Sequence, residues 1–286
     1  MPLSVGRYAP SPTGDLHLGN LRTALLAWLY SRLLMGRFLL RMEDLDTPRV
    51  VDGSADKILN DLETLGIDWD GDVTFQSNRL KIYQEMLNEL YEQGLTYPCY
   101  CSRKDIQQAA SAPHGQTAVY PGTCAQLTKS QRAVKQRDKN PAVRLRVNEL
   151  LKSDCGDFVI KRADGLYAYQ FAVVVDDLAQ GVTDVVRGMD LESSTARQQY
   201  LAETLNAQSS PIRYFHAPLL VDEAGQRMSK RDGSQSLSQW CEEGGSVESL
   251  ISYFANDLGL IDDPAPLSAQ SLLSEITLAD LTTCLD

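Results

Sequence analysis

The sequence lacks a segment that could span a membrane. Its most apolar stretch, residues 21–40, is interrupted by Arg22, Arg32 and Arg37, whereas a transmembrane helix needs about 20 consecutive apolar residues. The N-terminus also lacks the charged segment followed by an apolar segment that is typical of a secretory signal. We therefore expect a cytoplasmic protein that does not bind a membrane.

Cysteine and net positive charge are also scarce. Six cysteines among 286 residues are too few for a disulfide framework. The 27 basic and 38 acidic residues give a net charge of −11, which excludes a globally basic nucleic-acid coat but not a local cationic surface. Apolar residues make up 43% and charged residues 23% of the chain, and these values exclude a collagen-like or wholly disordered protein.

Two common nucleotide-binding loops are missing. No G-x-G-x-x-G follows the first predicted strand, and G-x-x-x-x-G-K-[ST] occurs nowhere in the chain. These absences argue against a dinucleotide-dependent dehydrogenase and against a P-loop NTPase.

The N-terminal pattern indicates an α/β fold with a parallel sheet. Residues 5–9 form a short apolar segment, a turn-forming segment covers 10–14, and apolar residues recur at helical spacing over 21–29. Residues 37–42 then read as a second strand that runs into the acidic residues Glu43 and Asp44. Ligands of such sheets bind beyond the carboxyl ends of the strands, so we expect a site at the 10–14 loop and Glu43.

The length corresponds to about two domains, or to one large domain with an insertion. The residue composition changes over 97–152, and we interpret this segment as an inserted subdomain. The pattern of regular secondary structure resumes with strand-like residues 158–162. We therefore divide the chain into a first half of the catalytic domain (1–96), the insertion (97–152), a second half (153–235) and a short helical C-terminal region (236–286).

Two short segments could bind an anion such as a phosphate. His17-Leu18-Gly19-Asn20 lies where a loop enters a predicted helix, so backbone N–H groups and the helix dipole would face the anion. Residues 227–231, Arg-Met-Ser-Lys-Arg, form a cationic loop after a strand-like segment, suited to charge that develops on phosphates. Taken alone, His17 could be a capping or packing residue, and the second segment a solvated basic hairpin.

Together these segments resemble the paired ATP-binding signatures of the class I aminoacyl-tRNA synthetases. Residues 6–14, 41–46 and 186–190 are similar to the glutamyl branch of that family, and the ordered match covers residues 5 to about 235. The resemblance implies a Rossmann-like catalytic domain with a parallel sheet. Asn20, Arg227 and Leu191 depart from the family pattern, and the first two keep a polar or cationic group.

The resemblance also implies the roles of individual residues. Glutamate carries two carboxylates and one ammonium, which call for planar cationic groups and a counter-carboxylate. The implied glutamate-binding residues are Arg7, Tyr8, Ala9, Pro10, Ser11, Glu43, Tyr169 and Arg187. Those implied for ATP, which binds with Mg²⁺, are His17, Gly19, Asn20, Ser229 and Lys230, with His17 and Lys230 catalytic. Alternatively, Glu43 and Arg187 form a structural ion pair between strand ends.

Only 286 − 231 = 55 residues follow the cationic loop, which is too few for a helical anticodon-binding domain. In this respect the chain resembles the glutamyl-queuosine tRNA(Asp) synthetases, which activate L-glutamate without tRNA and transfer it to queuosine at the wobble position of the tRNA(Asp) anticodon. Two alternatives stay open: a minimal glutamyl-tRNA synthetase that charges a 3′ end, and a catalytically idle paralogue that only binds. No motif indicates an oligomer, and we expect a monomer.

Three clustered cysteines predict one structural metal site per chain. Cys99, Cys101 and Cys124 lie in the insertion, and structural zinc takes four ligands. Generic zinc chemistry nominates His114 as the fourth ligand, whereas the family resemblance implies Tyr120. Three reduced cysteines without metal are the alternative. The basic run Lys129, Arg132, Lys135, Arg137 and Lys139 is either a solvated helix face or a contact for RNA phosphates.

Overall fold

The structure is a computed structural model that describes residues 4–110, 119–206, 211–220 and 235–285. The chain divides into two compact units, which are described separately. The first comprises Met1–Asn78, Gly181–Ser193 and Ile212–Asp286, and the second Arg79–Gln180 and Ser194–Pro211.

In chain order, the elements of the first unit are β1 (Val5–Tyr8), α1 (Leu18–Leu33), β2 (Arg37–Met42), η1 (Thr47–Arg49), α2 (Ser54–Thr64), β3 (Thr74–Phe75), η2 (Gln76–Arg79), β7 (Asp184–Gly188), η3 (Met189–Ser194), β8 (Arg213–Ala217), α9 (Leu237–Glu242), α10 (Val247–Asp257), α11 (Ala269–Glu275) and α12 (Leu278–Thr283). η2 ends at Arg79 and η3 ends at Ser194, which are the first residues of the two segments that form the second unit.

The described strands of the first unit form a five-stranded sheet in the order β3-β2-β1-β7-β8, with every pairing parallel. All residues of β1 are buried, as expected for a strand of a sheet covered on both faces. The predicted strand, helix and strand over residues 5–42 are confirmed as β1, α1 and β2. Because the strands are parallel, their carboxyl ends lie at one edge of the sheet.

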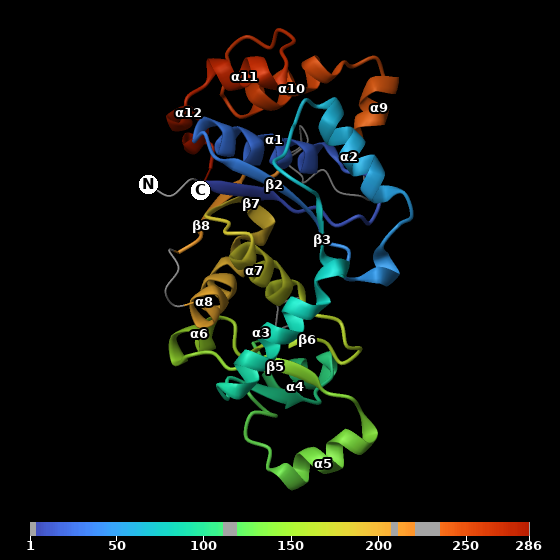
Figure 1. Ribbon diagram of the computed structural model, residues 1–286, viewed down its shortest axis with the longest axis vertical. Helices are drawn as coiled ribbons and strands as arrows, with labels where there is room; N and C mark the ends of the chain where they lie inside the picture. The colour runs from blue at the N-terminus through green and yellow to red at the C-terminus, as the bar shows by residue number, and fades with distance from the viewer. Residues whose placement is uncertain (1–3, 111–118, 207–210, 221–234, 286) are drawn as a thin grey trace. The chain divides into compact units, whose positions relative to one another are not determined.

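Helix α1 is buried on nearly all sides. Its side chains from Ala24 to Ser31 are all buried, because the helix packs on β1, β2 and β7 with one side and on α11 and α12 with another. Figure 1 shows α1 between the sheet and the C-terminal helices α10, α11 and α12. This double coverage explains the long apolar stretch of residues 21–40. Among the described residues, no helix is long and apolar enough to cross a membrane.

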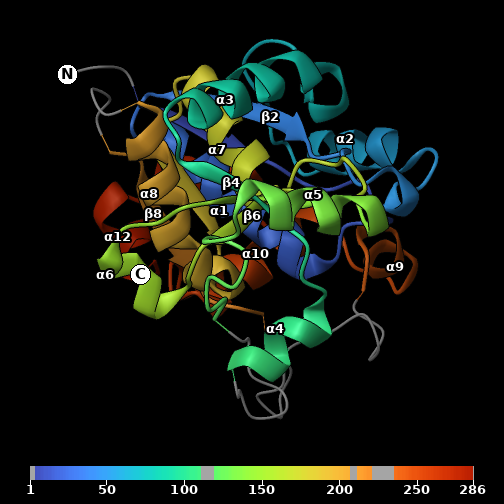
Figure 2. The same ribbon diagram turned by 90° about the horizontal axis from the view of Figure 1, so that it is seen from below.

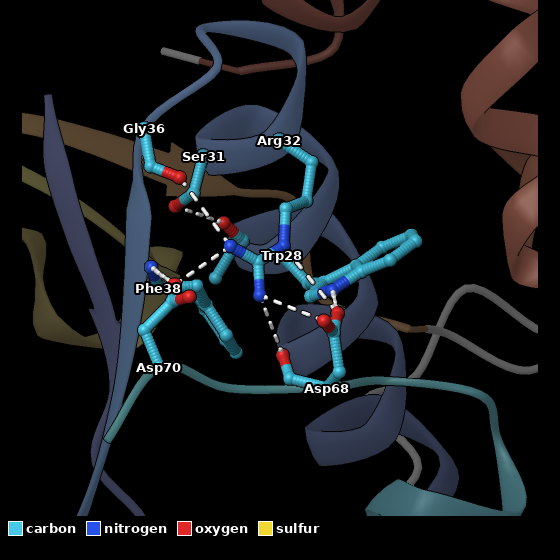
Figure 3. Close-up of polar contacts among 8 residues, drawn as sticks. Trp28, Ser31, Arg32, Gly36, Phe38, Asp68 and Asp70 are labelled. Carbon is cyan, nitrogen blue, oxygen red and sulfur yellow. Dashed lines mark hydrogen bonds and ion pairs between the residues drawn. The ribbon is translucent and has the colours of Figure 1, made fainter.

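Two carboxylates from the segment between α2 and β3 hold the C-terminal end of α1 (Figure 3). Arg32 Nη1 lies 2.7 Å from Asp70 Oδ2, and Arg32 Nη2 lies 3.1 Å from Asp68 Oδ2. The Trp28 indole donates to Asp68 at 2.6 Å, and the Phe38 backbone N–H donates to Asp70 at 2.7 Å. The two aspartates therefore join α1 to the start of β2.

The second unit contains α3 (Leu80–Glu92), β4 (Thr96–Cys99), α4 (Arg103–Ala110), α5 (Lys129–Asp138), β5 (Ala142–Leu145), α6 (Glu149–Asp154), β6 (Phe158–Lys161), α7 (Tyr169–Ala179) and α8 (Thr195–Leu205). Its described strands form a three-stranded antiparallel sheet in the order β4-β5-β6.

The place of β6 differs from the sequence prediction. We expected residues 158–162 to open the second half of the catalytic sheet, but β6 pairs with β5 in the antiparallel sheet. The burial of β6 alternates, whereas four of the five residues of β7 are buried without a break. Alternation is typical of a sheet with one covered face, and continuous burial of a central parallel strand. The second unit contains residues Arg79–Gln180 and Ser194–Pro211, so it extends on both sides of the predicted insertion 97–152.

Candidate active site and metal cluster

Several predicted site residues lie at the carboxyl edge of the parallel sheet. β1, β2, β7 and β8 end at Tyr8, Met42, Gly188 and Ala217. Arg7 and Arg187 are each the second-last residue of their strand, and Glu43 directly follows β2. The structure thus brings the predicted Arg7, Glu43 and Arg187 to one edge of one sheet.

The strand register places several cationic side chains on the same face of this sheet. Gly6 aligns with Asp184 and Arg7 with Leu39, so Arg187 and Arg41, each two residues beyond the neighbour of Arg7, share its face. The three arginines are 5%, 3% and 0% exposed, for Arg7, Arg187 and Arg41. Sequence analysis placed Arg41 in a motif but gave it no role.

Arg187 is oriented by residues of β8 that sequence analysis missed. Its Nε–H donates to Nε2 of His216 at 3.3 Å, so the imidazole accepts at this nitrogen. The guanidinium carbon lies 4.6 Å from the centre of the Tyr214 ring, which is within the range of a cation–π contact. His216 and Tyr214 are two residues apart in β8, the strand that pairs with β7. This alternate spacing is the sequence signal that both side chains lie on one face of a strand.

Glu43 joins the end of β2 to the loop after β1. Its backbone N–H donates to the Pro10 carbonyl at 2.9 Å, and its Oε1 lies 3.8 Å from Nη2 of Arg41. The end of the loop is held by Ser54 of α2, whose hydroxyl donates to the Gly14 carbonyl at 2.8 Å. Within the loop, Pro10 is buried, Ala9 half-buried and Ser11 exposed.

The side chain of Tyr8 lies in the core between β1 and α1. Its hydroxyl donates to the Asn20 carbonyl at 3.2 Å, and burial raises its pKa. Strand alternation puts this side chain on the face opposite to that of Arg7. Tyr8 therefore ties the end of β1 to the first turn of α1.

The first turn of α1 contains the predicted ATP-binding residues His17, Gly19 and Asn20. His17 is the N-cap residue, but its side chain makes no capping hydrogen bond, so the capping alternative for this histidine is not supported. Its carbonyl instead accepts the backbone N–H groups of Asn20 and Leu21 at 2.8 and 3.0 Å. The half-buried His17 imidazole therefore lies at the carboxyl edge of the sheet without serving as a cap.

Arg227, Ser229 and Lys230 lie outside the described residues, but the residues that flank their segment are described. The Leu18 backbone N–H donates to the Gln235 carbonyl at 3.0 Å, and His17 forms a β-bridge with Ser236. On the other flank, the Cβ of Leu220 would lie 3.7 Å from a Cβ placed on Gly19. Both flanks of segment 221–234 therefore lie at the first turn of α1.

Tyr169 belongs to the second unit, whereas the residues described above belong to the first. It is the first residue of α7 and is 38% exposed. The structure thus assigns it an exposed position at a helix N-terminus.

The three predicted metal-binding cysteines form a cluster in the second unit. The sulfur atoms of Cys99, Cys101 and Cys124 all lie within 4.8 Å of one another, and those of Cys101 and Cys124 are 3.6 Å apart. A disulfide would need about 2.05 Å, whereas two thiolates on one zinc ion lie about 3.8 Å apart, given Zn–S bonds of ~2.3 Å. The cluster could therefore hold a metal ion.

Tyr120 lies beside the cysteine cluster. Its hydroxyl oxygen lies 3.4 Å from the sulfur of Cys99 and 3.9 Å from that of Cys101, and it accepts the Cys124 backbone N–H at 2.8 Å. A β-bridge to Gly156 fixes its backbone. His114, the other predicted fourth ligand, lies outside the described residues.

Arg144 of β5 covers the Tyr120 ring and influences the thiols. Its guanidinium carbon lies 3.7 Å from the ring centre. Burial alone would raise the pKa of Cys99, but hydrogen bonds from Tyr120 and Arg144 hold that pKa below its ordinary value. Burial and the adjacent Cys124 raise the pKa of Cys101 to about 12. The cluster thus combines one thiol that ionises readily with one that needs a cation to do so.

Comparison with known proteins identifies the family. Residues 5–262 match the family model described as tRNA synthetases class I (E and Q), catalytic domain. A Nocardia farcinica protein named glutamyl-Q tRNA(Asp) synthetase is 50% identical over 272 residues, which cover 91% of this chain and 86% of the relative. A Deinococcus radiodurans protein of the same name is 45% identical over 285 residues, covering 94% of each.

Solved structures agree on the fold. The crystal structure of a glutamate-tRNA synthetase from Elizabethkingia anophelis is similar with a TM-score of 0.79 at 24% identity, covering 97% of this chain and 66% of that chain. The protein thus spans slightly less than two thirds of that longer chain, and at this identity the likeness concerns the fold alone. With the family match over 5–262, these findings show that the chain belongs to the class I (E and Q) tRNA synthetase catalytic domain family.

Proposed function

We propose that the protein activates L-glutamate with ATP and transfers it to queuosine in the anticodon of tRNA(Asp). The observation that carries this proposal is the placement of Arg7, Arg187 and Glu43 at one edge of the sheet, within a chain whose relatives bear the name glutamyl-Q tRNA(Asp) synthetase. Neither a 3′-charging enzyme nor an idle paralogue is favoured, because the closely similar relatives carry this name and the described site keeps its charged residues.

The arginine pair suits an amino acid with two carboxylates. Arg7 and Arg187 are buried on one face of the sheet, where each guanidinium can donate two parallel hydrogen bonds to a carboxylate. Glu43 would accept from the substrate ammonium. Tyr8, Ala9, Pro10 and Ser11 would shape this end of the site, and the family resemblance nominates Tyr169 as a further glutamate-binding residue. His216 and Tyr214 would hold the Arg187 guanidinium in place.

In the first step, an oxygen of the glutamate α-carboxylate attacks the α-phosphorus of ATP. The bond between the α-phosphorus and the bridging oxygen breaks, and pyrophosphate leaves with that electron pair. A queuosine hydroxyl then attacks the carbonyl of the glutamyl-adenylate and AMP leaves, so that no covalent enzyme intermediate is needed. Positioning and charge stabilisation dominate such phosphoryl transfers. ATP would bring Mg²⁺, which neutralises phosphate charge.

Residues of α1 and of the segment after β8 would bind the nucleotide. Gly19 lets the phosphates approach the backbone closely, while His17 and Asn20 offer polar side chains at the start of the helix. Ser229 and Lys230 would contact the phosphates from segment 221–234, and His17 and Lys230 would stabilise charge in the transition state.

We also propose that the cysteine cluster binds one structural zinc ion. Cys99, Cys101 and Cys124 would supply three thiolates and Tyr120 the fourth ligand, as its hydroxyl lies beside two of the sulfurs. A closed set of four protein ligands is typical of a structural rather than a catalytic zinc site. The ion would stabilise the loops that follow β4.

The decisive test of the function uses labelled glutamate and two tRNA preparations. One comes from cells that make queuosine and the other from cells that cannot, and the 3′ ends of both are removed. We expect label on the queuosine-containing RNA alone. Label that disappears with the 3′ end would indicate a charging synthetase. No label on either RNA, together with no glutamate-dependent ATP–pyrophosphate exchange, would leave a binding protein.

We expect helix α5 to contact tRNA phosphates. It lies beyond the three-stranded sheet in Figure 1 and in front of β6 in Figure 2, and it has no buried residue. Lys129, Arg132 and Lys135 follow one another at spacings of three residues, so they share one face of α5, and Lys139 directly follows the helix. In a chain with net charge −11 this face is a local cationic surface.

The α5 contact predicts a specific loss of RNA binding. Lys129→Gln combined with Lys135→Gln should weaken tRNA binding roughly tenfold and reduce the slope of log K against log salt by about 1 to 2, because each lost phosphate contact removes about 0.9. Glutamate-dependent pyrophosphate exchange without tRNA should not change. Binding is measured by fluorescence anisotropy over a salt series.

The matched control removes two lysines of the same unit outside α5. Lys81 and Lys152 are 92% and 48% exposed and pair with Glu85 and Glu149. Lys81→Gln combined with Lys152→Gln should leave the salt dependence as in the unmodified protein. If both double variants weaken binding equally, α5 is a solvated helix face and binding depends only on net charge.

A further inference from the structure

An ion pair between a buried arginine of α1 and an exposed aspartate of α10 joins α1 to the C-terminal helices. Arg22 of α1 is 2% exposed, although it carries a full charge. Its Nη1 pairs with the Oδ2 of Asp257, the last residue of α10. Its Nη2 donates to the carbonyl of Pro218, directly after β8, at 2.6 Å. A buried arginine needs such partners because desolvation of the charge is costly.

These contacts converge on the turn that we propose for ATP. Arg22 lies two residues after Asn20, in the turn that follows the His17–Asn20 segment. Pro218 leads into Leu220, which lies next to Gly19. On the other flank of segment 221–234, the Gln235 carbonyl accepts the Leu18 N–H. Arg22 thus links α1 to α10 and to the residues that follow β8. The Leu18 N–H links α1 to Gln235, which precedes the N-cap residue of α9.

We infer that Arg22 and Asp257 position the first turn of α1 relative to α10 and to the residues that follow β8. The C-terminal helices, to which sequence analysis assigned no role, then act as a fixed support for the nucleotide-binding residues. Arg22 is a positioning residue in this arrangement, since it acts through the backbone of α1 and of Pro218. The inference rests on the proposed function, because it assumes that the first turn of α1 binds ATP.

A planar guanidinium is required because the two partners lie in different elements. The guanidinium donates from one terminal nitrogen to Asp257 and from the other to Pro218. A lysine ammonium is a single point charge on a flexible chain and would not hold both partners in this arrangement. Arg22→Lys therefore tests the geometry, while Asp257→Asn tests the charge of the acceptor.

The experiment compares the two ends of α1. Arg32, ten residues further along the helix, also pairs with carboxylates, Asp68 and Asp70 (Figure 3), but it lies at the opposite end from the nucleotide turn. Arg32→Lys is therefore the matched control for Arg22→Lys. The Kd of ATP is measured by calorimetry, the KM values of ATP and glutamate by pyrophosphate exchange, and the stability by thermal unfolding.

We expect Arg22→Lys and Asp257→Asn to raise the Kd and KM of ATP and to lower the exchange rate about 10- to 100-fold, because small misplacements of reacting groups have effects of this size. The KM of glutamate should change less than twofold. Arg32→Lys should change the melting temperature but not the nucleotide parameters. The inference is wrong if Arg22→Lys behaves like Arg32→Lys, if both KM values rise equally, or if the unmodified protein does not bind ATP.

The ATP affinity separates this inference from the proposed function. If the unmodified protein binds ATP but shows no glutamate-dependent exchange, the proposed activation of glutamate is wrong. The Kd values of Arg22→Lys, Asp257→Asn and Arg32→Lys still decide whether Arg22 positions the nucleotide turn.

Discussion

Replacing Arg187 with methionine is expected to raise the KM of glutamate by about 100-fold or more while leaving the KM of ATP within a factor of two. Removal of one partner from a buried, hydrogen-bonded charge pair costs about 2–5 kcal/mol, and 2.7 kcal/mol corresponds to about 100-fold. Arg187 is 3% exposed, so little water could replace its hydrogen bonds. Pyrophosphate exchange at varied glutamate and varied ATP measures both constants.

Two further variants test why Arg187 has this effect. Arg187→Lys keeps the charge but loses the planar group, so we expect an intermediate increase in the KM of glutamate. Arg213→Met is the control, because Arg213 belongs to the neighbouring strand β8, pairs with Asp184 at 2.6 Å and is 58% exposed. If Arg213→Met raises the KM of glutamate as much as Arg187→Met, the general charge of the sheet is responsible and Arg187 is not a glutamate ligand.

The sequence predicted the elements of the first unit well because their signals are local. Residues 5–42 show an apolar strand, a turn-forming loop, an apolar helix and a second strand, and all four segments occur where expected. The motif residues lie in the last residues of the strands or directly after them, so their positions along the chain place them at the carboxyl edge of a parallel sheet. The sequence pattern therefore placed the 10–14 loop and Glu43 at this edge, and the family resemblance added Arg7 and Arg187.

What could not be predicted depends on how strands pair. The hydrophobic pattern of residues 158–162 indicates a strand but not its neighbours, and β6 joined the antiparallel sheet of the second unit. The contact between Arg187 and His216 needs β7 and β8 to be adjacent and in a particular register. Such pairings depend on packing between residues about 30 positions apart, which no local pattern encodes.

Side-chain direction is also not given by a motif alone. Sequence analysis grouped Tyr8 with Arg7 because they are adjacent in one motif, yet neighbouring residues of a strand point to opposite faces. The structure accordingly places the Tyr8 side chain against α1, with its hydroxyl on the Asn20 carbonyl. The pairing of buried Arg22 with Asp257 was also hidden, because the two residues are 235 positions apart.

Removal of the proposed zinc ion is expected to destabilise the second unit while leaving the first folded. Structural zinc contributes about 10–16 kcal/mol to the folding of zinc-finger peptides, against a total stability of about 5–15 kcal/mol for a typical domain. We expect Cys124→Ser to bind less than about a tenth of the metal of the unmodified protein and to lower the melting temperature of this unit by about 10 °C or more. Elemental analysis and thermal unfolding with and without chelator measure these effects.

The control for the cysteine variant is Cys155→Ser. Cys155 belongs to the same unit, and its thiol donates to the Leu151 carbonyl at 3.5 Å, a contact that a serine hydroxyl can replace. This variant should keep one zinc ion per chain and its full stability. If the unmodified protein, purified without chelator, contains no zinc and does not respond to chelation, the cluster consists of three reduced thiols and the zinc proposal is wrong.

The identity of the fourth ligand follows from two single substitutions. Tyr120→Phe keeps the ring on which Arg144 stacks but removes the oxygen beside the sulfurs, so it should lower zinc affinity without removing the packing. His114→Ala should leave the affinity unchanged. Because a mixed sulfur and oxygen set differs from a set with nitrogen, the visible spectrum of the cobalt-substituted protein should change in Tyr120→Phe alone. A spectral change in His114→Ala instead would assign the fourth position to the histidine.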